Sequence, residues 1–271
     1  MSAALDSAVH ALLRKTAEAV VMPRYRNLKA AEVAQKGAND PVTIADREAE
    51  AMLADGLARI MPDADVVGEE AAYADPTVLD RLDGLCWIVD PIDGTSNFAS
   101  GQGHFALMIA LADGGETQAS WIYDPRRARL CSAALGGGAF IDGERVCARP
   151  RNHRPPRLAA MTRFMEAGQR AIFEAEIAPH YELAKAPGCA AEQYPLVALG
   201  EHDLAIYERT LAWDHAAGCL FLNEAGGKSA RADGSPYRVN SKRRGMISAT
   251  DAALFEDLAA RLISAGYAPA E

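Results

Sequence analysis

The sequence has few of the features that mark secreted, disulfide-bonded or membrane proteins. Its 271 residues include five cysteines, an odd number without any Cys-x-x-Cys pair, so we expect reduced thiols and no zinc or redox site. No apolar run reaches the roughly 20 residues of a membrane span. The first residues include Asp6, Arg14 and Glu18 and do not resemble a secretion signal. We therefore expect a cytoplasmic protein with no membrane partner.

Positive charge is also in short supply. The chain has 28 Lys and Arg against 37 Asp and Glu, which gives a net charge of −9. Such acidity argues against nucleic acid as a partner, because proteins that bind it neutralise phosphates with Lys and Arg. An anionic substrate would need cations from another source. The hydrophobic fraction of 49% is that of a globular protein, and the length allows one large domain or two of moderate size.

Hydrophobic spacing predicts two helices, then a sheet, then alternating strands and helices. The helices cover residues 5–21, ended by Pro23, and 44–60, capped by Thr43. Short β-branched or aromatic runs separated by turn residues predict a largely antiparallel meander, at 65–67, 85–89, 105–111 and 119–123. A basic, Pro-rich linker at 148–157 follows, with phosphate contact as its alternative role. The later strands lie near 158–161, 183 and 203–207, and the later helices at 166–178, 190–199, 214–225 and 251–265. We therefore predict an N-terminal α+β half, residues 1–148, and a C-terminal α/β half, residues 149–271.

The most informative stretch is Trp87–Phe98, which reads WIVDPIDGTSNF. A buried strand would deliver Asp90 at its end, and Asp93 would begin the turn into a short helix. Two carboxylates and the carbonyl of Ile92 are the oxygen ligands that Mg²⁺ prefers. The free amides of the helix that follows suit a phosphate. The alternative is that the two aspartates only cap and turn the chain.

Two further acidic positions favour the metal site. Glu69 follows a short predicted strand, and Asp214 is expected at the N-cap of the helix 214–225. Multinuclear metal sites are usually assembled from one carboxylate per element. Together with Asp90 and Asp93 these side chains would carry a charge of about −4 and a phosphate monoester about −2, which three Mg²⁺ would cancel. The sequence thus predicts a magnesium centre that lets an acidic protein bind a phosphate.

These motifs resemble those of the inositol monophosphatase superfamily of Mg²⁺-dependent, lithium-sensitive phosphatases. The resemblance spans nearly the whole chain and rests on Gly68-Glu69-Glu70, Trp87–Phe98, Trp213–Gly218 and Lys36 before Asp40–Asp46. It implies an αβαβα layered sandwich whose α+β and α/β halves meet at a centre of two or three Mg²⁺ ions. It also implies a small phosphorylated substrate and a homodimer.

The resemblance implies a role for each position. The metal ligands would be Glu69, Asp90, the carbonyl of Ile92, Asp93 and Asp214. Glu69 and Thr95 would activate the attacking water, and Asp46 would orient Thr95. A third ion or the surroundings of the ligands would involve Lys36 and Glu70. The substrate would be contacted by Gly94, Thr95, Ser96, Ala190, Glu208 and Arg209.

The alcohol side of the site is less fixed by the resemblance. The segment that precedes Asp214 is one residue shorter than in the inositol enzymes, so Tyr207, Glu208 or Arg209 could face the substrate. We expect inositol monophosphate, with histidinol phosphate, a 3′(2′),5′-bisphosphorylated nucleotide and fructose bisphosphate as alternatives. A regulatory protein associated with RNA or transcription, using the arginines of 149–157, is the alternative from another class.

Overall fold

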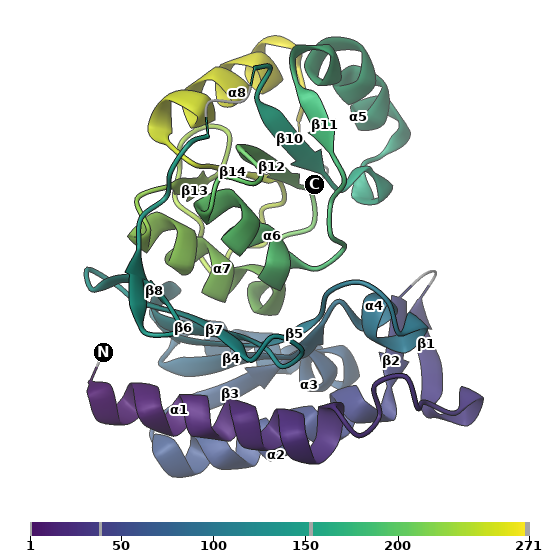
Figure 1. The fold of residues 1–271 in the computed structure, drawn as a ribbon, viewed down its shortest axis with the longest axis vertical. Helices are drawn as coiled ribbons and strands as arrows, with labels where there is room; N and C mark the ends of the chain where they lie inside the picture. Colours follow the sequence, from purple (N-terminus) through teal and green to yellow (C-terminus); the bar gives the residue numbers. More distant parts are fainter. Residues whose placement is uncertain (1, 38–39, 152–153, 269–271) are drawn as a thin grey trace.

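A computed structural model describes residues 2–37, 40–151 and 154–268. Figure 1 shows five layers, in the order helices, sheet, helices, sheet, helices. This confirms the predicted αβαβα sandwich. The helices are α1 (Ala3–Thr16), α2 (Ile44–Ile60), α3 (Glu69–Ala74), α4 (Thr95–Ser100), α5 (Ala167–Ile172), α6 (Ala190–Ala198), α7 (Ala212–Glu224) and α8 (Ala252–Ser264). In the described residues no helix is both long and apolar enough to cross a membrane.

The helices α1 and α2 form the first layer. The hydroxyl of Ser2 accepts a hydrogen bond from the amide of Leu5 and caps α1. The predicted continuation to residue 21 is corrected, because α1 ends at Thr16 and Ala17–Val21 forms a wider π-helical turn. The prediction for α2 is confirmed, since the side chain of Thr43 caps its first turn.

A seven-stranded sheet forms the second layer. Its order is β3-β4-β5-β6-β7-β8-β9, with β3 parallel to β4 and every later pair antiparallel, as the meander predicted. The strand β4 is buried over all eight residues, because α2 contacts one face and α7 the other. This burial explains its continuous apolar run. The strands are β3 (Asp65–Gly68), β4 (Cys86–Asp93), β5 (Ala106–Asp113), β6 (Glu116–Asp124), β7 (Arg129–Ala134), β8 (Gly138–Ile141) and β9 (Glu144–Val146).

A five-stranded sheet forms the fourth layer, beyond α6 and α7. Its order is β11-β10-β12-β14-β13, parallel between β10 and both neighbours and antiparallel elsewhere. The strands are β10 (Arg157–Ala160), β11 (Glu182–Ala184), β12 (Leu204–Tyr207), β13 (Lys228–Ala230) and β14 (Met246–Ala249). The last two were not predicted, because three or four residues show no usable period. A hairpin of β1 (Val33–Gly37) and β2 (Asp40–Thr43) stands apart from both sheets.

The basic segment 148–157 connects the two sheets. It is not wholly a solvated linker, because the amide of Ala148 donates to the carbonyl of Ala225 at 2.6 Å and that of Arg149 to Ala198 at 3.3 Å. Its start is therefore attached to the central helix layer. Residues 152–153 of this segment lie outside the described residues.

Candidate metal centre

The end of β4 delivers two aspartates to one point. Opposite β5, Asp90 pairs with Met108 and Asp93 with Ala106, so β4 contains one more residue than its partner and bulges between them. The amide of Ile92 donates to Asp90 Oδ1 at 3.0 Å and fixes that carboxylate. The turn then needs Gly94, which has a φ of 84° and whose Cβ would lie 2.7 Å from the carbonyl oxygen of His104.

Three aspartates form a compact cluster. One carboxylate oxygen from each of Asp90, Asp93 and Asp214 lies within 4.8 Å of the others. Burial, followed by the charge of Glu69, raises the pKa of Asp90 well above its usual range, and burial raises the pKa of Asp93 to about 6. Buried carboxylates that repel one another are stabilised by a proton or a cation. A set made only of oxygen donors fits Mg²⁺.

The position of Asp214 corrects one prediction. Helix α7 begins at Ala212 after an extended Leu211, so Asp214 is the third helical residue and not the N-cap. An acidic residue in the first turn is favoured by the helix dipole just as a cap is, so the sequence pattern does not separate the two. The guanidinium of Arg209 lies 3.5 Å from Asp214 Oδ2.

Glu69 opens α3 on the same pocket. Its Oε1 accepts a hydrogen bond from Lys36 Nζ at 2.9 Å, and the same ammonium also contacts Glu70. Burial and then the charge of Asp214 raise the pKa of Glu69 to about 7, although Lys36 acts in the opposite direction. Lys36 therefore neutralises part of this acidic group, and its positive charge makes it a neighbour of the centre and not a ligand.

Sequence reasoning missed Glu50, which supports Glu69 from behind. The buried carboxylate of Glu50 accepts the amides of Glu70 at 2.7 Å and Ala71 at 2.8 Å, and so caps α3. It packs so closely that a Cβ on Gly68 would lie 2.3 Å from Glu50 Cδ. The sequence of α2 around Glu50 does not indicate this contact. Gly68, directly before Glu69, does indicate that another group approaches the backbone closely at this point.

Thr95 and Asp46 lie in contact with each other. The Thr95 hydroxyl lies 3.2 Å from Asp46 Oδ1 and 3.0 Å from the carbonyl oxygen of Ile92, either of which can accept its proton. The other oxygen of Asp46 accepts from the amide and hydroxyl of Thr43 at 2.7 and 2.6 Å. Burial raises the pKa of Asp46 to about 6. The capping box of α2 thus holds Asp46 toward the pocket.

Asp93 also joins the centre to the C-terminal part of the chain. Its Oδ2 accepts the amide of Ala191 at 2.6 Å and lies 3.1 Å from Cys189 Sγ. Both come from the start of α6, and both Cys189 and Ala190 line the pocket. The first turn of α6 is therefore fixed against the aspartate cluster.

Comparison with known proteins decides the family. The model of the "Inositol monophosphatase family" matches residues 3–265. The chain belongs to the inositol monophosphatase family. Because proteins of this family are metal-dependent phosphatases, the chain is a metal-dependent phosphoric monoester hydrolase.

Its relatives include proteins with two different names. An inositol-1-monophosphatase of Bacillus subtilis is 32% identical over 73% of this chain and 75% of its own length. The Nus factor SuhB of Escherichia coli is 33% identical over 77% of this chain and 78% of its own length. Among solved structures, the extragenic suppressor protein suhB of Bartonella henselae superimposes with a TM-score of 0.80 at 28% identity, covering 96% and 98% of the two chains.

In this inositol monophosphatase-family chain the alcohol side differs from the prediction. Glu208 lines the pocket, but only 1% of it is exposed, and its carboxylate oxygens accept hydrogen bonds from Gln169 Nε2 and the Tyr267 hydroxyl. The geometry therefore does not support Glu208 as a substrate contact. Arg163 and Phe164, which sequence reasoning did not single out, line the same pocket with Arg209.

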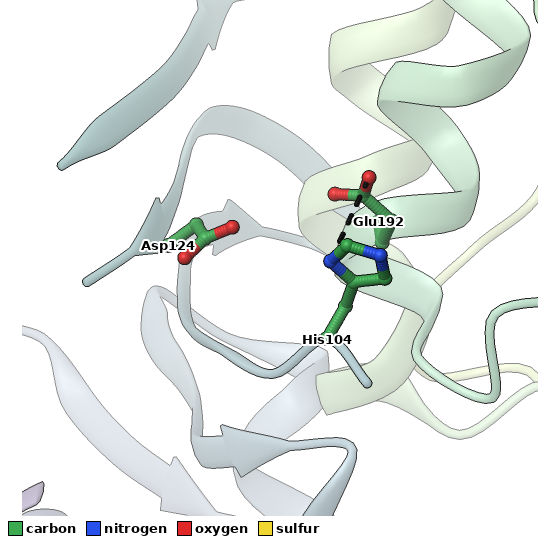
Figure 2. A group of neighbouring side chains, drawn as sticks. All are labelled: His104, Asp124 and Glu192. Carbon is green, nitrogen blue, oxygen red and sulfur yellow. Dashed lines mark ion pairs between the residues drawn. The ribbon is translucent and has the colours of Figure 1, made fainter. Parts of the chain in front are cut away.

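A second group of possible ligands lies outside the predicted centre. Figure 2 shows His104, Asp124 and Glu192, with the ion pair of His104 and Glu192 at 3.9 Å. Arg127 Nη1 is 2.9 Å from both oxygens of Glu192, and Arg129 Nη2 is 2.5 Å from one. Guanidinium groups already supply the cation here. The group therefore ties the seven-stranded sheet to α6 and does not resemble a metal site.

Proposed function

We propose that the protein is a Mg²⁺-dependent phosphomonoesterase that acts on a small phosphorylated alcohol through an activated water. The observation that carries this proposal is the cluster of Asp90, Asp93 and Asp214, whose oxygens lie within 4.8 Å of one another beside Glu69. A dianionic phosphate would be repelled by these carboxylates alone. Two or three Mg²⁺ would supply the missing positive charge, lower the pKa of a water and stabilise the displaced oxygen.

We assign the ligands and contacts as the sequence suggested, with Glu208 removed. The metal ions would be held by Glu69, Asp90, the carbonyl of Ile92, Asp93 and Asp214. The phosphate would be contacted by the amides of Gly94 and Thr95 and by Ser96, all of which line the pocket. On the alcohol side the contacts would be Ala190 and Arg209.

Thr95, Asp46 and Glu69 would together position the attacking water and accept its proton. When the Thr95 hydroxyl donates to Asp46, its lone pairs are free to accept a hydrogen bond from the attacking water. Glu69, which lies beside the aspartate cluster, would accept the proton of that water as a general base. The ammonium of Lys36 keeps Glu69 oriented toward the pocket.

The proposal is tested by phosphate release with and without Mg²⁺. The panel contains inositol monophosphate, which the family relationship favours, together with histidinol phosphate, a bisphosphorylated nucleotide and fructose bisphosphate. We expect Asp90→Asn and Asp214→Asn to lose activity by about 10³-fold or more while remaining folded. The control is Asp80→Asn, an exposed residue that does not line the pocket. Full activity of the two cluster variants, or activity in excess chelator, would refute the proposal.

The remaining features of the proposal concern the whole protein. We propose a cytoplasmic homodimer and inhibition by Li⁺ on the strength of the family relationship. We also propose two halves, residues 1–148 and 149–271, divided at the basic, Pro-rich segment. The expectation that nucleic acid is not a partner is not confirmed, because one matched relative is named a Nus factor. Size-exclusion chromatography with light scattering tests the dimer.

A further inference from the structure

Two arginines and one phenylalanine form the wall of the pocket on its alcohol side. Arg163 and Phe164 belong to the turn Thr162–Phe164 that follows β10, and Arg209 precedes α7. The guanidinium carbon of Arg163 lies 4.5 Å from the centre of the Phe164 ring, and that of Arg209 lies 4.7 Å from it. The ring thus holds two positive groups close together at one side of the pocket.

Glu208, the acidic residue that precedes Arg209 in the sequence, faces away from this wall. Both oxygens of Glu208 accept hydrogen bonds, from Gln169 on α5 and from Tyr267 after α8, and neither of these two donors lines the pocket. The described residues that line the pocket include Glu208 and the two arginines. Apart from the residues of the metal centre and His215 beside it, these three are the charged side chains of the lining. With Glu208 turned inward, the charged side chains of this wall are those of Arg163 and Arg209.

The backbone at Arg209 is held in place from the helix layer. His215 Nε2 lies 2.8 Å from the carbonyl oxygen of Arg209, and His215 Nδ1 lies 2.8 Å from the Tyr194 hydroxyl. The carbonyl can only accept, so Nε2 carries the proton and Nδ1 accepts from the tyrosine. Since the Arg209 guanidinium also pairs with Asp214, it stands between the aspartate cluster and the Phe164 ring.

We propose that Arg163 and Arg209 bind a second phosphate group on the alcohol portion of the substrate, so that the enzyme prefers bisphosphorylated esters to neutral phosphorylated polyols. This inference rests on the proposed function and names the substrate class of the same site. Guanidinium groups match phosphate geometry through paired N–H donors. A polyol such as inositol would instead place uncharged hydroxyls against two cations, and it would gain little from them.

Matched pairs of esters test this preference. The pairs are a hexose bisphosphate with the corresponding hexose monophosphate, and a nucleoside 3′,5′-bisphosphate with the nucleoside 3′-monophosphate. We expect kcat/KM to be about tenfold or more higher for the bisphosphate of at least one pair, well above the factor of about two that a second cleavable group could contribute. Which pair shows the preference tells whether the second phosphate is carried by a sugar or by a nucleoside.

Variants of Arg163 separate recognition from catalysis, because Arg163 is an exposed residue that is not among the assigned metal ligands. Arg163→Ala should lower kcat/KM for the bisphosphate about tenfold, mainly through KM, and change that for the monophosphate by less than about twofold. Arg163→Lys should restore part of the loss, since it returns the charge without the planar pair of donors. The matched control is Arg149→Ala, which removes an exposed arginine from a distant surface.

The outcomes distinguish the two proposals. If no ester releases phosphate in the presence of Mg²⁺, the proposed function fails. If esters are cleaved but each bisphosphate matches its monophosphate, the inference about the arginines is refuted while the function stands. Equal losses for both esters in Arg163→Ala would also refute it, because the arginine would then support the site without recognising a second phosphate.

Discussion

Replacing Asp93 with asparagine should stabilise the protein when no metal is bound. Asp93 is buried, and burial raises its pKa from 3.8 to about 6. Asparagine has the same shape and can still accept the amide of Ala191 through its carbonyl oxygen. It removes one of the negative charges that repel one another in the cluster. The residue that we assign to metal binding is therefore expected to weaken the metal-free fold.

The sign and size of this effect follow from the two pKa values. Between pH 3.8 and about 6 the folded state binds more protons at Asp93 than the unfolded state does, so stability falls as pH rises. Above about pH 6 the Asp93 carboxylate is ionised in both states, and the full free-energy cost of burying its charge lowers the stability of the fold. A shift of about two units at about 1.36 kcal/mol per unit corresponds to about 3 kcal/mol at neutral pH. For a chain of this size, that difference raises Tm by about 5–10 °C.

Thermal unfolding in excess chelator measures the effect. At about pH 7.5 Asp93→Asn should unfold above the wild type, and the difference should shrink as the pH falls through about 5. Adding Mg²⁺ should reverse the order, since only the wild type binds it fully. The control is Asp233→Asn, because hydrogen bonds from Ser235 lower the pKa of Asp233 and its replacement should not stabilise. A less stable Asp93→Asn in chelator at pH 7.5 would refute this reasoning.

Three further predictions concern the residues around the centre. Glu50→Ala removes the carboxylate that accepts hydrogen bonds from two amides of α3 at 2.7 and 2.8 Å. Calorimetric titration should therefore show that the variant binds Mg²⁺ about tenfold more weakly than the wild type, with a smaller loss for Glu50→Gln. Equal affinities of the wild type and Glu50→Ala would contradict this prediction. His215 is buried with a pKa lowered to about 3, so this residue alone lowers stability by about 1.4 kcal/mol per unit as pH drops below 6.5. In urea, the stability difference between wild type and His215→Gln should change with pH by this slope, and a constant difference would contradict it. Arg129→Met removes one of the positive charges that pair with the buried carboxylate of Glu192, so it should lower the free energy of unfolding, measured in urea, by about 3 kcal/mol. Arg151→Met breaks an exposed ion pair and should lower it by less than about 1 kcal/mol. Similar losses in the two variants would contradict the structural role given to Arg129.

The parts of the site that could be predicted are those encoded within single segments. Asp90 and Asp93 are both found in one stretch because a strand end, a bulge and a turn follow one another there. Asp46 and Thr43 lie three residues apart, the spacing of a capping box, so their contact is also local. Such features depend on backbone geometry over a few residues, which sequence patterns describe well.

The parts that could not be predicted depend on how distant segments pack. Glu50 reaches α3 across 20 residues, and Tyr267 reaches Glu208 across 59. No residue type or spacing at either end indicates its partner. The inward orientation of Glu208 follows from the position of α5 and of the chain after α8, which only the assembled layers define. The role given to Glu208 was therefore the least secure part of the prediction.

The site draws its residues from four of the five layers, since Asp46 lies on α2 in the first layer. Asp93 belongs to the seven-stranded sheet, Asp214 to the central helices, and Arg163 to the turn that leaves the five-stranded sheet. The aspartates repel one another only when these layers are packed, so the repulsion is a cost of folding that a cation would offset. Because Asp93 also holds the first turn of α6 through Ala191, the same cation would tighten the contact between sheet and helix. Metal binding and layer packing would thus be coupled through the carboxylate of Asp93.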